Sequence, residues 1–412
     1  MFKHIGWRDS SLAAALALLA VIVSVTGFYA VGSLMTERGG FDVWFSADVP
    51  RVYSNMLTTF GNHYRTSVHP IFSVLVHPIT TILQILTGWT DATITMVVFA
   101  AFSAISIVLL YAFLRLMSLP AGAAALFTLL YISSATFIYW SGIPETYLPA
   151  SLSIILMLLL LAMGPRAGWL WWVIGSAGTL SITITNAMFG FVATVVTWPW
   201  RGVVRIILVA TLLVMAASVA QKLIYNRAQL FFDPRSLIDE LRYTPISDDA
   251  PDFEWTPAAN IHALLVTTIV APTPEIGRSP TGRNPVIIDN QMRTVLDRGP
   301  VGIAAGASWV ALLAIGLWGA ARARRVGLGL LLSLAGQAVL HLIYGYPTFL
   351  YAMHVAPVLI GIAACAWYTP LRHYALGLAA ATVLLGGITN IETMREAVDL
   401  AHAVMAEKAA NR

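Results

Sequence analysis

The stretch FDVWFSADVPRVYSNMLTTFGNHYRTSVHP, residues 41–70, concentrates the polar chemistry of a chain that is otherwise mostly apolar. It holds two carboxylates, two arginines and two histidines: Asp42, Asp48, Arg51, Arg65, His63 and His69. Long apolar runs lie on both sides of it. Ionisable groups at the edge of apolar segments are costly to desolvate, so such a concentration indicates a working site. Asp48 is the first candidate for a catalytic residue.

The composition predicts an all-α integral membrane protein. Of the 412 residues, 58% are hydrophobic and 11% are charged, which excludes a soluble fold. Apolar runs approach or exceed the roughly 20 residues of a spanning helix, whereas a β-barrel would show short alternating segments. The net charge of +4 is spread over short loops, which does not indicate nucleic-acid binding. The single Cys365 excludes an intrachain disulfide.

Eleven segments are predicted to span the membrane: 11–34, 92–114, 121–139, 147–163, 169–186, 187–200, 203–225, 301–320, 326–344, 350–368 and 374–390. The first is too long for the apolar core of a signal peptide and is interpreted as a retained anchor. Residues 68–87 are apolar but contain two His-Pro pairs, and proline disfavours helical geometry at the residue before it.

Charge distribution decides how residues 68–87 are interpreted. If they do not span, the arginines and lysines of the short loops all fall on one side, as cytoplasmic loops require. We therefore expect 68–87 to be a juxtamembrane element on the outer surface. The N-terminus is then cytoplasmic and the C-terminus outside, and every acidic residue except Asp9 lies outside or at the outer boundary.

The predicted organisation has three parts. Residues 1–225 form a transmembrane catalytic module with an outer loop at 35–90, residues 226–300 form an outer loop with an interfacial helix after Thr256-Pro257, and residues 301–412 form the last helices and a tail. A loop as long as 226–300 in a compact protein is more often a binding element than a spacer. It contains Arg278 and Arg283, two further candidates for binding a phosphate group.

Three groups far apart in sequence end at the same predicted membrane boundary. They are Asp48, Glu145 in the turn before the 147–163 segment, and Tyr351 with His354 at the start of a late span. A partly desolvated carboxylate has a raised pKa and can take a proton from an alcohol. Arginines can hold a phosphate as a leaving group. Together these groups predict transfer from a lipid phosphate to a hydroxyl acceptor.

Each candidate also has a structural interpretation. Asp48 suits the cap of a helix starting at Pro50, and Glu145 suits a helix dipole. Arg51 and Arg65 suit lipid headgroups. The histidines at 63, 69 and 77 raise a divalent metal as an alternative, although they lack regular ligand spacing. His354 suits a satisfied buried histidine.

The motif Asp-x-Pro-Arg-x-Tyr at 48–53, followed by Arg65 and His69-Pro70, resembles the GT-C glycosyltransferases. The similarity is to bacterial members related to protein mannosyltransferases and lipid A aminoarabinose transferases. Glu145 in a short outer turn, the long outer loop, and residues 349–357 fit the same layout. Two departures are Val49, where many relatives have a second acid, and the absence of the late arginine near Tyr351.

The resemblance implies inverting transfer of a sugar from a polyprenyl-phosphate donor, with Asp48 as the general base. We expect Glu145 to position the acceptor or to serve as the second acid. The expected substrate-binding residues are Arg51, Tyr53, Arg65, His69, Arg278, Arg283, Tyr351 and His354. The acceptor would be a glycan, a lipid or a protein. The expected location is the bacterial inner membrane, with the site on the periplasmic side. A transporter or lipid flippase, or a transferase of whole lipid-linked glycans or phospho-groups, are the alternatives.

Overall fold

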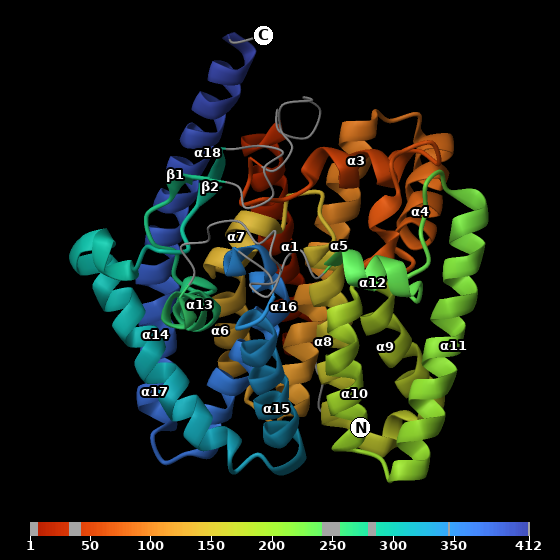
Figure 1. Cartoon of the computed structure of the whole chain (residues 1–412). Coiled ribbons are helices and arrows are strands. Elements are labelled where there is room, and N and C mark those ends of the chain that lie inside the picture. Colours follow the sequence, from red (N-terminus) through yellow and green to blue (C-terminus); the bar gives the residue numbers. More distant parts are fainter. Residues whose placement is uncertain (1–6, 33–42, 241–255, 279–285, 345–346, 411–412) are drawn as a thin grey trace.

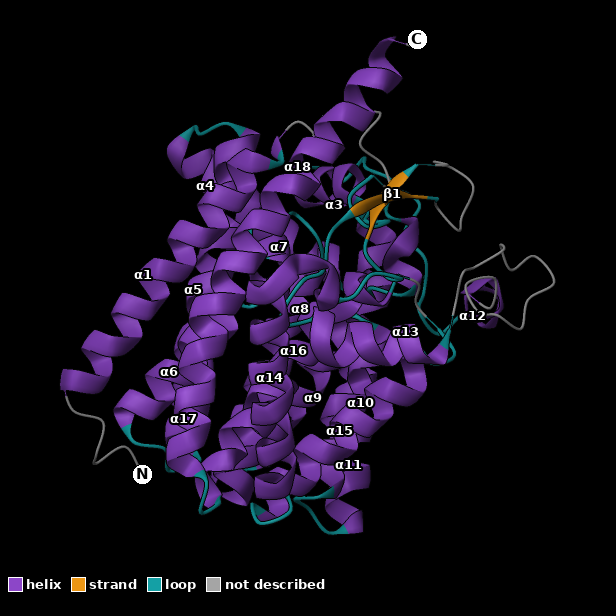
Figure 2. Ribbon diagram, turned by 90° about the vertical axis from the view of Figure 1, so that its left-hand side faces the viewer, coloured by secondary structure: helices purple, strands orange, loops and turns teal. Residues whose placement is uncertain are grey.

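The chain folds into a bundle of helices in which α1 (Trp7–Ala30) begins at one end of the molecule and α18 (Gly387–Ala410) ends at the other (Figure 1). The computed structural model describes residues 7–32, 43–240, 256–278, 286–344 and 347–410. Viewed from the side, helices fill almost the whole cross-section, and the two short strands lie at one end (Figure 2). The protein is therefore an all-α, multi-pass membrane protein, as its composition predicts.

Seven helical stretches within the described residues are long and apolar enough to cross a membrane. They are Trp7–Ala30 (α1), Asp91–Leu116 (α5), Tyr147–Ala167, Trp200–Ile224 (α11), Val295–Ala320, Thr348–Tyr368 and Arg372–Lys408. Within the other four stretches lie α8 (Tyr147–Met163), α14 (Gly299–Ala320), α16 (Ala352–Ala364), and α17 (Arg372–Ala381) with α18 (Gly387–Ala410). These seven stretches correspond to seven of the eleven predicted spans.

The remaining four predicted spans contain shorter or less apolar helices. They are α6 (Ala121–Ile132) with α7 (Ala135–Trp140), α9 (Trp169–Ile182), α10 (Ala187–Val195) and α15 (Arg324–His341). Between α6 and α7 the chain breaks at Ser134, whose hydroxyl accepts from the Phe137 N–H and caps α7. Between α9 and α10 it breaks at Thr183, which is extended (φ −152°). The number of complete crossings stays a prediction.

Two helices of the first outer region lie at the end of the bundle where α18 ends (Figure 1). These are α3 (Val49–Leu57) and α4 (Phe72–Thr87), which pack against each other. α4 continues through Pro78 and ends at Gly88, whose φ of +64° suits glycine. With 16 residues, α4 is shorter than the spanning helices.

The later outer region is tied to the first one by backbone hydrogen bonds. Strand β1 (Glu275–Gly277) pairs antiparallel with β2 (Ile287–Asp289), and the Ile288 N–H donates to the Val43 carbonyl at 2.7 Å. Two short helices, α12 (Pro234–Glu240) and α13 (Pro257–His262), belong to the same region. α13 begins at the proposed helix start, with the Thr256 hydroxyl as its cap.

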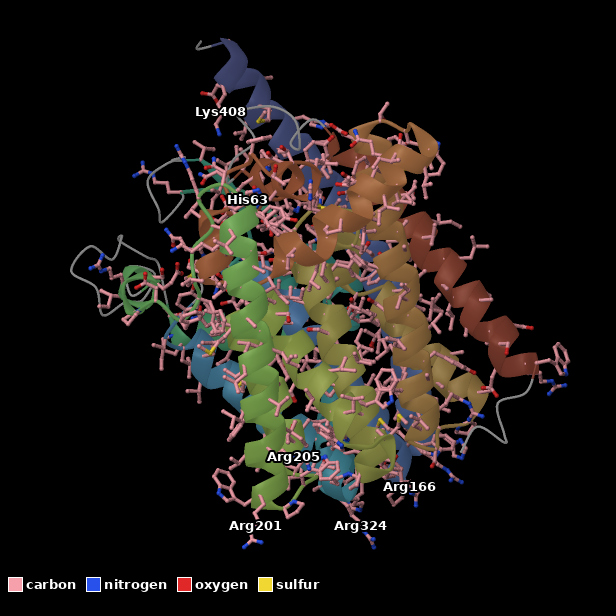
Figure 3. The ribbon with its side chains drawn as sticks, turned by 90° about the vertical axis from the view of Figure 1, so that its right-hand side faces the viewer. His63, Arg166, Arg201, Arg205, Arg324 and Lys408 are labelled. Atoms are coloured by element: carbon pink, nitrogen blue, oxygen red, sulfur yellow. The ribbon has the colours of Figure 1, made fainter. Side chains whose placement is uncertain are left out.

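At the opposite end, Asp9 joins α1 to α5. Its carboxylate accepts from the Tyr111 hydroxyl and from Arg115 Nε, both at 2.6 Å, and it is 5% exposed. This pairing explains the one acidic residue that the charge pattern placed on the inner side. Arg166, Arg201, Arg205 and Arg324 lie at this same end, and His63 and Lys408 lie at the other (Figure 3). The segregation of charge that the sequence predicts is therefore present in the fold.

Candidate functional site

A strained turn directs Asp48 toward the helix bundle. Phe45 and Ser46 have φ values of 48° and 62°, in the left-handed region that non-glycine residues rarely adopt. Phe45 is fully buried, and its ring packs on those of Tyr139 and Phe349 at 5.6 and 5.2 Å between centroids. Strain of this kind persists only where packing enforces it, and it is concentrated at functional sites.

The main chain at Asp48 is held by the turn between α7 and α8. The Asp48 N–H donates to Glu145 Oε1 at 2.9 Å, and the Thr146 N–H donates to Glu145 Oε2 at 2.8 Å. The structure thus brings together the two carboxylates that the sequence placed at one boundary. Each Glu145 oxygen is engaged by a backbone donor.

The Asp48 carboxylate is oriented by one arginine and keeps one oxygen open. Arg51 donates to Asp48 Oδ2 through Nε at 3.0 Å and Nη2 at 2.8 Å. No described residue hydrogen-bonds to Oδ1, and the side chain is 28% exposed. Although Asp48 is the cap residue of α3, its side chain makes no capping hydrogen bond. The carboxylate therefore has a free oxygen, which a purely capping role does not require.

Glu145 titrates near neutral pH. Glu145 is 3% exposed, and this burial raises its pKa to about 7. The nearby Arg51 lowers the pKa, and Asp48 raises it. Glu145 does not lie within the first turn of α8, which begins at Tyr147. Its contacts with two main-chain donors indicate a positioning role.

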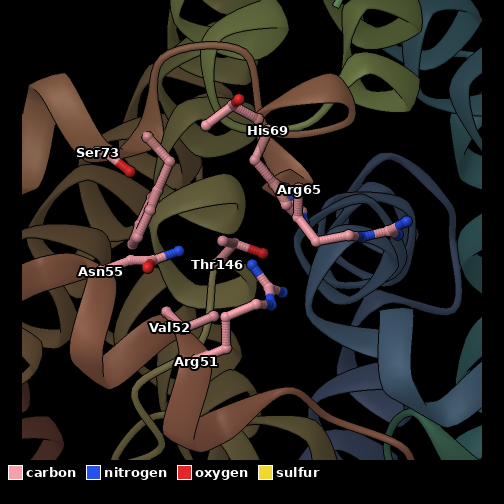
Figure 4. A pocket seen from close by; sticks show the side chains of 9 residues that line it. Arg51, Val52, Asn55, Arg65, His69, Ser73 and Thr146 are labelled. Atoms are coloured by element: carbon pink, nitrogen blue, oxygen red, sulfur yellow. The ribbon is translucent and has the colours of Figure 1, made fainter. Parts of the chain in front are cut away.

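A small cavity adjoins this pair (Figure 4). Its lining residues are Arg51, Val52, Asn55, Arg65, Thr66, His69, Phe72, Ser73 and Thr146. Two guanidinium groups in one cavity suit an anion with several oxygens, such as a phosphate.

Both arginines of the cavity also contact carboxylates. Arg51 pairs with Asp48, and Arg65 Nη1 donates to Glu240 Oε1 at 2.5 Å. The other Glu240 oxygen accepts from the Tyr344 hydroxyl at 3.0 Å. Glu240 has no signal in the sequence beyond being an acidic residue of the outer loop. An anion entering the cavity would compete with it for Arg65.

Each histidine of the first outer region has its own hydrogen-bond partners. His63 bonds the Ser73 hydroxyl and the Thr58 carbonyl, and burial lowers its pKa to about 4. His69 bonds the Ile182 carbonyl, and His77 bonds the Tyr225 hydroxyl. Within the described part of the chain, no group of three or more His, Cys, Asp or Glu side chains is placed to hold a metal ion.

The late segment that contains Tyr351 and His354 contacts the site through aromatic rings. Tyr147, which begins α8, lies 5.9 Å from Tyr351 and 5.6 Å from His354 between centroids. His354 is 1% exposed, and no described residue hydrogen-bonds to its Nε2.

Two of the other predicted binding residues, Tyr53 and Arg278, lie outside the cavity lining. Tyr53 packs against the core near Asp91, and it does not line the cavity. Arg278 is exposed beyond β1 and is also absent from the lining. Arg283 and Asp42 lie outside the described residues. Arg51 is the arginine that shares the cavity with Arg65.

No protein-family model matches this sequence, and no curated protein matches it. Among solved structures, the chain is similar to the apo form of the Archaeoglobus fulgidus oligosaccharyltransferase. The TM-score is 0.51 at 12% identity, over 96% of this chain and 56% of that one. The two share a fold. The form of that enzyme tethered to an acceptor peptide with an NVT sequon gives a TM-score of 0.48 at 11% identity.

At this level of identity the likeness shows a shared fold alone. The chain spans only about half the length of the oligosaccharyltransferase (56%).

Proposed function

We propose that this chain is an integral membrane glycosyltransferase that moves a sugar from a polyprenyl-phosphate donor to a hydroxyl acceptor. The observation that carries the proposal is the Asp48 carboxylate, which has Oδ2 held by Arg51, Oδ1 open, and an arginine-lined cavity beside it. The likeness to an oligosaccharyltransferase fold supports the same activity class.

The reaction is a direct displacement with inversion at the anomeric carbon. The acceptor oxygen forms a bond to this carbon, and its proton passes to Asp48 Oδ1. The bond from the anomeric carbon to the phosphate oxygen breaks, and its electron pair leaves on the phosphate. Arg51 and Arg65 stabilise that charge in the cavity, while Glu145 fixes the main chain at Asp48.

The site belongs to the outer face in this proposal. The arginines that mark the inner surface lie at the opposite end of the bundle (Figure 3). We propose a periplasmic site in a bacterial inner membrane, with a glycan, lipid or protein of the cell envelope as the acceptor. Tyr351 and His354 would line the route from the late helices to Asp48.

The test compares Asp48→Asn with Asp91→Asn, a matched change at an exposed carboxylate that begins α5. Each protein is purified in detergent and incubated with radiolabelled polyprenyl-phosphate sugars and membrane extract as acceptor. We expect Asp48→Asn to abolish transfer at unchanged protein level and Asp91→Asn to retain it. Full transfer by Asp48→Asn would remove the assignment, and movement of an unaltered lipid across vesicles would favour a flippase.

A further inference from the structure

The hydrogen bonds of His69 fix which of its ring nitrogens carries the proton. Nδ1 lies 2.8 Å from the Ile182 carbonyl oxygen, which can only accept, so Nδ1 is the protonated nitrogen. Nε2 then has a lone pair. No described residue hydrogen-bonds to Nε2, and it is not among the fully buried unpartnered atoms. Since the ring lines the cavity, Nε2 is the atom left to face it.

The ring also stays neutral at physiological pH. Burial lowers the pKa of His69 well below its usual value, and the charges of Arg51 and Arg65 lower it further. The cavity therefore combines two guanidinium donors with an imidazole that presents an acceptor.

The phosphate of the proposed donor, a phosphodiester, cannot satisfy this acceptor by itself. The oxygens of a phosphodiester accept hydrogen bonds and have none to donate, so they would face an unfavourable lone pair at Nε2. A group that carries a hydroxyl close to the anion satisfies both halves of the cavity. In a glycosyl phosphate, the hydroxyl on the carbon next to the anomeric carbon lies close to the phosphate.

We propose that His69 Nε2 accepts a hydrogen bond from this sugar hydroxyl and makes the cavity selective for glycosylated over bare polyprenyl phosphate. The inference rests on the proposed function and names the part of the donor that the cavity reads. His69 is a specificity residue here, distinct from the base at Asp48.

His69→Asn is the informative variant. The asparagine amide can still donate to the Ile182 carbonyl, but it has no acceptor at the Nε2 position. His77→Asn is the matched control, because His77 lies on the same segment, bonds the Tyr225 hydroxyl and does not line the cavity. Binding to purified protein in detergent is measured with three lipids: polyprenyl phosphate and its glucosyl and mannosyl esters.

We expect the wild type and His77→Asn to bind a glycosylated lipid more tightly than polyprenyl phosphate. His69→Asn should lose about five- to tenfold in affinity for the glycosylated lipid, as expected for one hydrogen bond, and change little for the bare lipid. Equal loss for both lipids, or no loss, would overturn the inference. Failure of the wild type to bind any of the three would instead count against the proposed function.

A 2-deoxy sugar donor provides the same comparison if His69→Asn does not fold. The wild type should bind the 2-deoxy donor about five- to tenfold more weakly than its parent. Equal affinity for the two donors would contradict the role of Nε2.

Discussion

The main-chain N–H of Asp48 donates to the Glu145 carboxylate at 2.9 Å, which joins residues 97 positions apart. Through this bond the turn between α7 and α8 sets the position of a residue in the first outer region. Glu145 has no need to touch a substrate in order to matter, because any change in its charge or place is transmitted to the backbone of Asp48.

Activity should depend on the ionisation of Glu145. The ionised carboxylate accepts from both N–H groups, and its pKa is about 7, so transfer should rise with pH through this value. Glu145→Gln should reduce transfer and flatten this part of the pH profile. The profile of kcat/KM between pH 5.5 and 8.5 tests the prediction, with Glu275→Gln at an outer carboxylate as the control. A midpoint near pH 7 that persists in Glu145→Gln would contradict it.

The free energy of unfolding should also depend on the ionisation of Glu145, and it should fall as the pH rises. The folded pKa lies above the ordinary value of 4.5, so the folded state binds this proton more tightly. That stabilisation is complete below pH 4.5 and is lost as the pH rises to 7. Relative to Glu145→Gln, the wild type should lose about 3 kcal/mol over this range, at about 1.4 kcal/mol for each pKa unit. Melting temperatures of the two proteins across this range provide the measurement, and parallel curves would exclude the effect.

Removing the charge of Glu240 should strengthen donor binding. Glu240 competes for Arg65, so Glu240→Gln makes that guanidinium more available to a phosphate. The KM for the lipid donor should fall about two- to fivefold, on the scale of a partly exposed ion pair. Asp233→Asn, a change in the same outer segment, should leave KM unchanged. A raised KM in Glu240→Gln would show that the contact with Arg65 supports the site instead.

A methyl group at Gly142 should disturb catalysis from outside the cavity. Gly142 lies three residues before Glu145. A Cβ at Gly142 would overlap the Ser24 carbonyl oxygen and contact the Phe28 N–H of α1. Overpacking of this kind costs about 1–3 kcal/mol, and displacement of the turn should lower transfer about tenfold or more. In Gly122→Ala the new Cβ meets no described atom within 4 Å, so it serves as the control. Transfer rates and melting temperatures of both variants decide the matter; normal transfer in Gly142→Ala would contradict the coupling.

Much of the architecture followed from composition and charge. Long apolar runs require helices in a membrane because every buried backbone group must be paired internally, and seven such helical stretches are present among the described residues. The position of basic residues predicted which loops share a side, and the arginines at one end of the bundle agree with it. The same reasoning placed Asp48 and Glu145 at one boundary.

The sequence did not predict where an apolar run breaks into two helices. Residues 121–139 appear as one apolar run, yet the chain breaks at Ser134, where a hydroxyl caps the second helix. Serine can cap a helix or lie within it, and tertiary packing decides between these outcomes. Pro78 shows the reverse case, since it lies inside a continuous helix.

By itself, the sequence determined that this protein lies in a membrane, that it is helical, and which of its charges share a side. It also determined which residue types gather near Asp48. These features depend on local composition. Only the tertiary structure decided that Glu240 reaches Arg65 across 175 positions, that Glu145 holds the Asp48 backbone, and that Ile182 fixes the proton of His69. These contacts join distant parts of the chain, and hydrogen bonds form over about 3 Å, a distance that no pattern of residue types encodes.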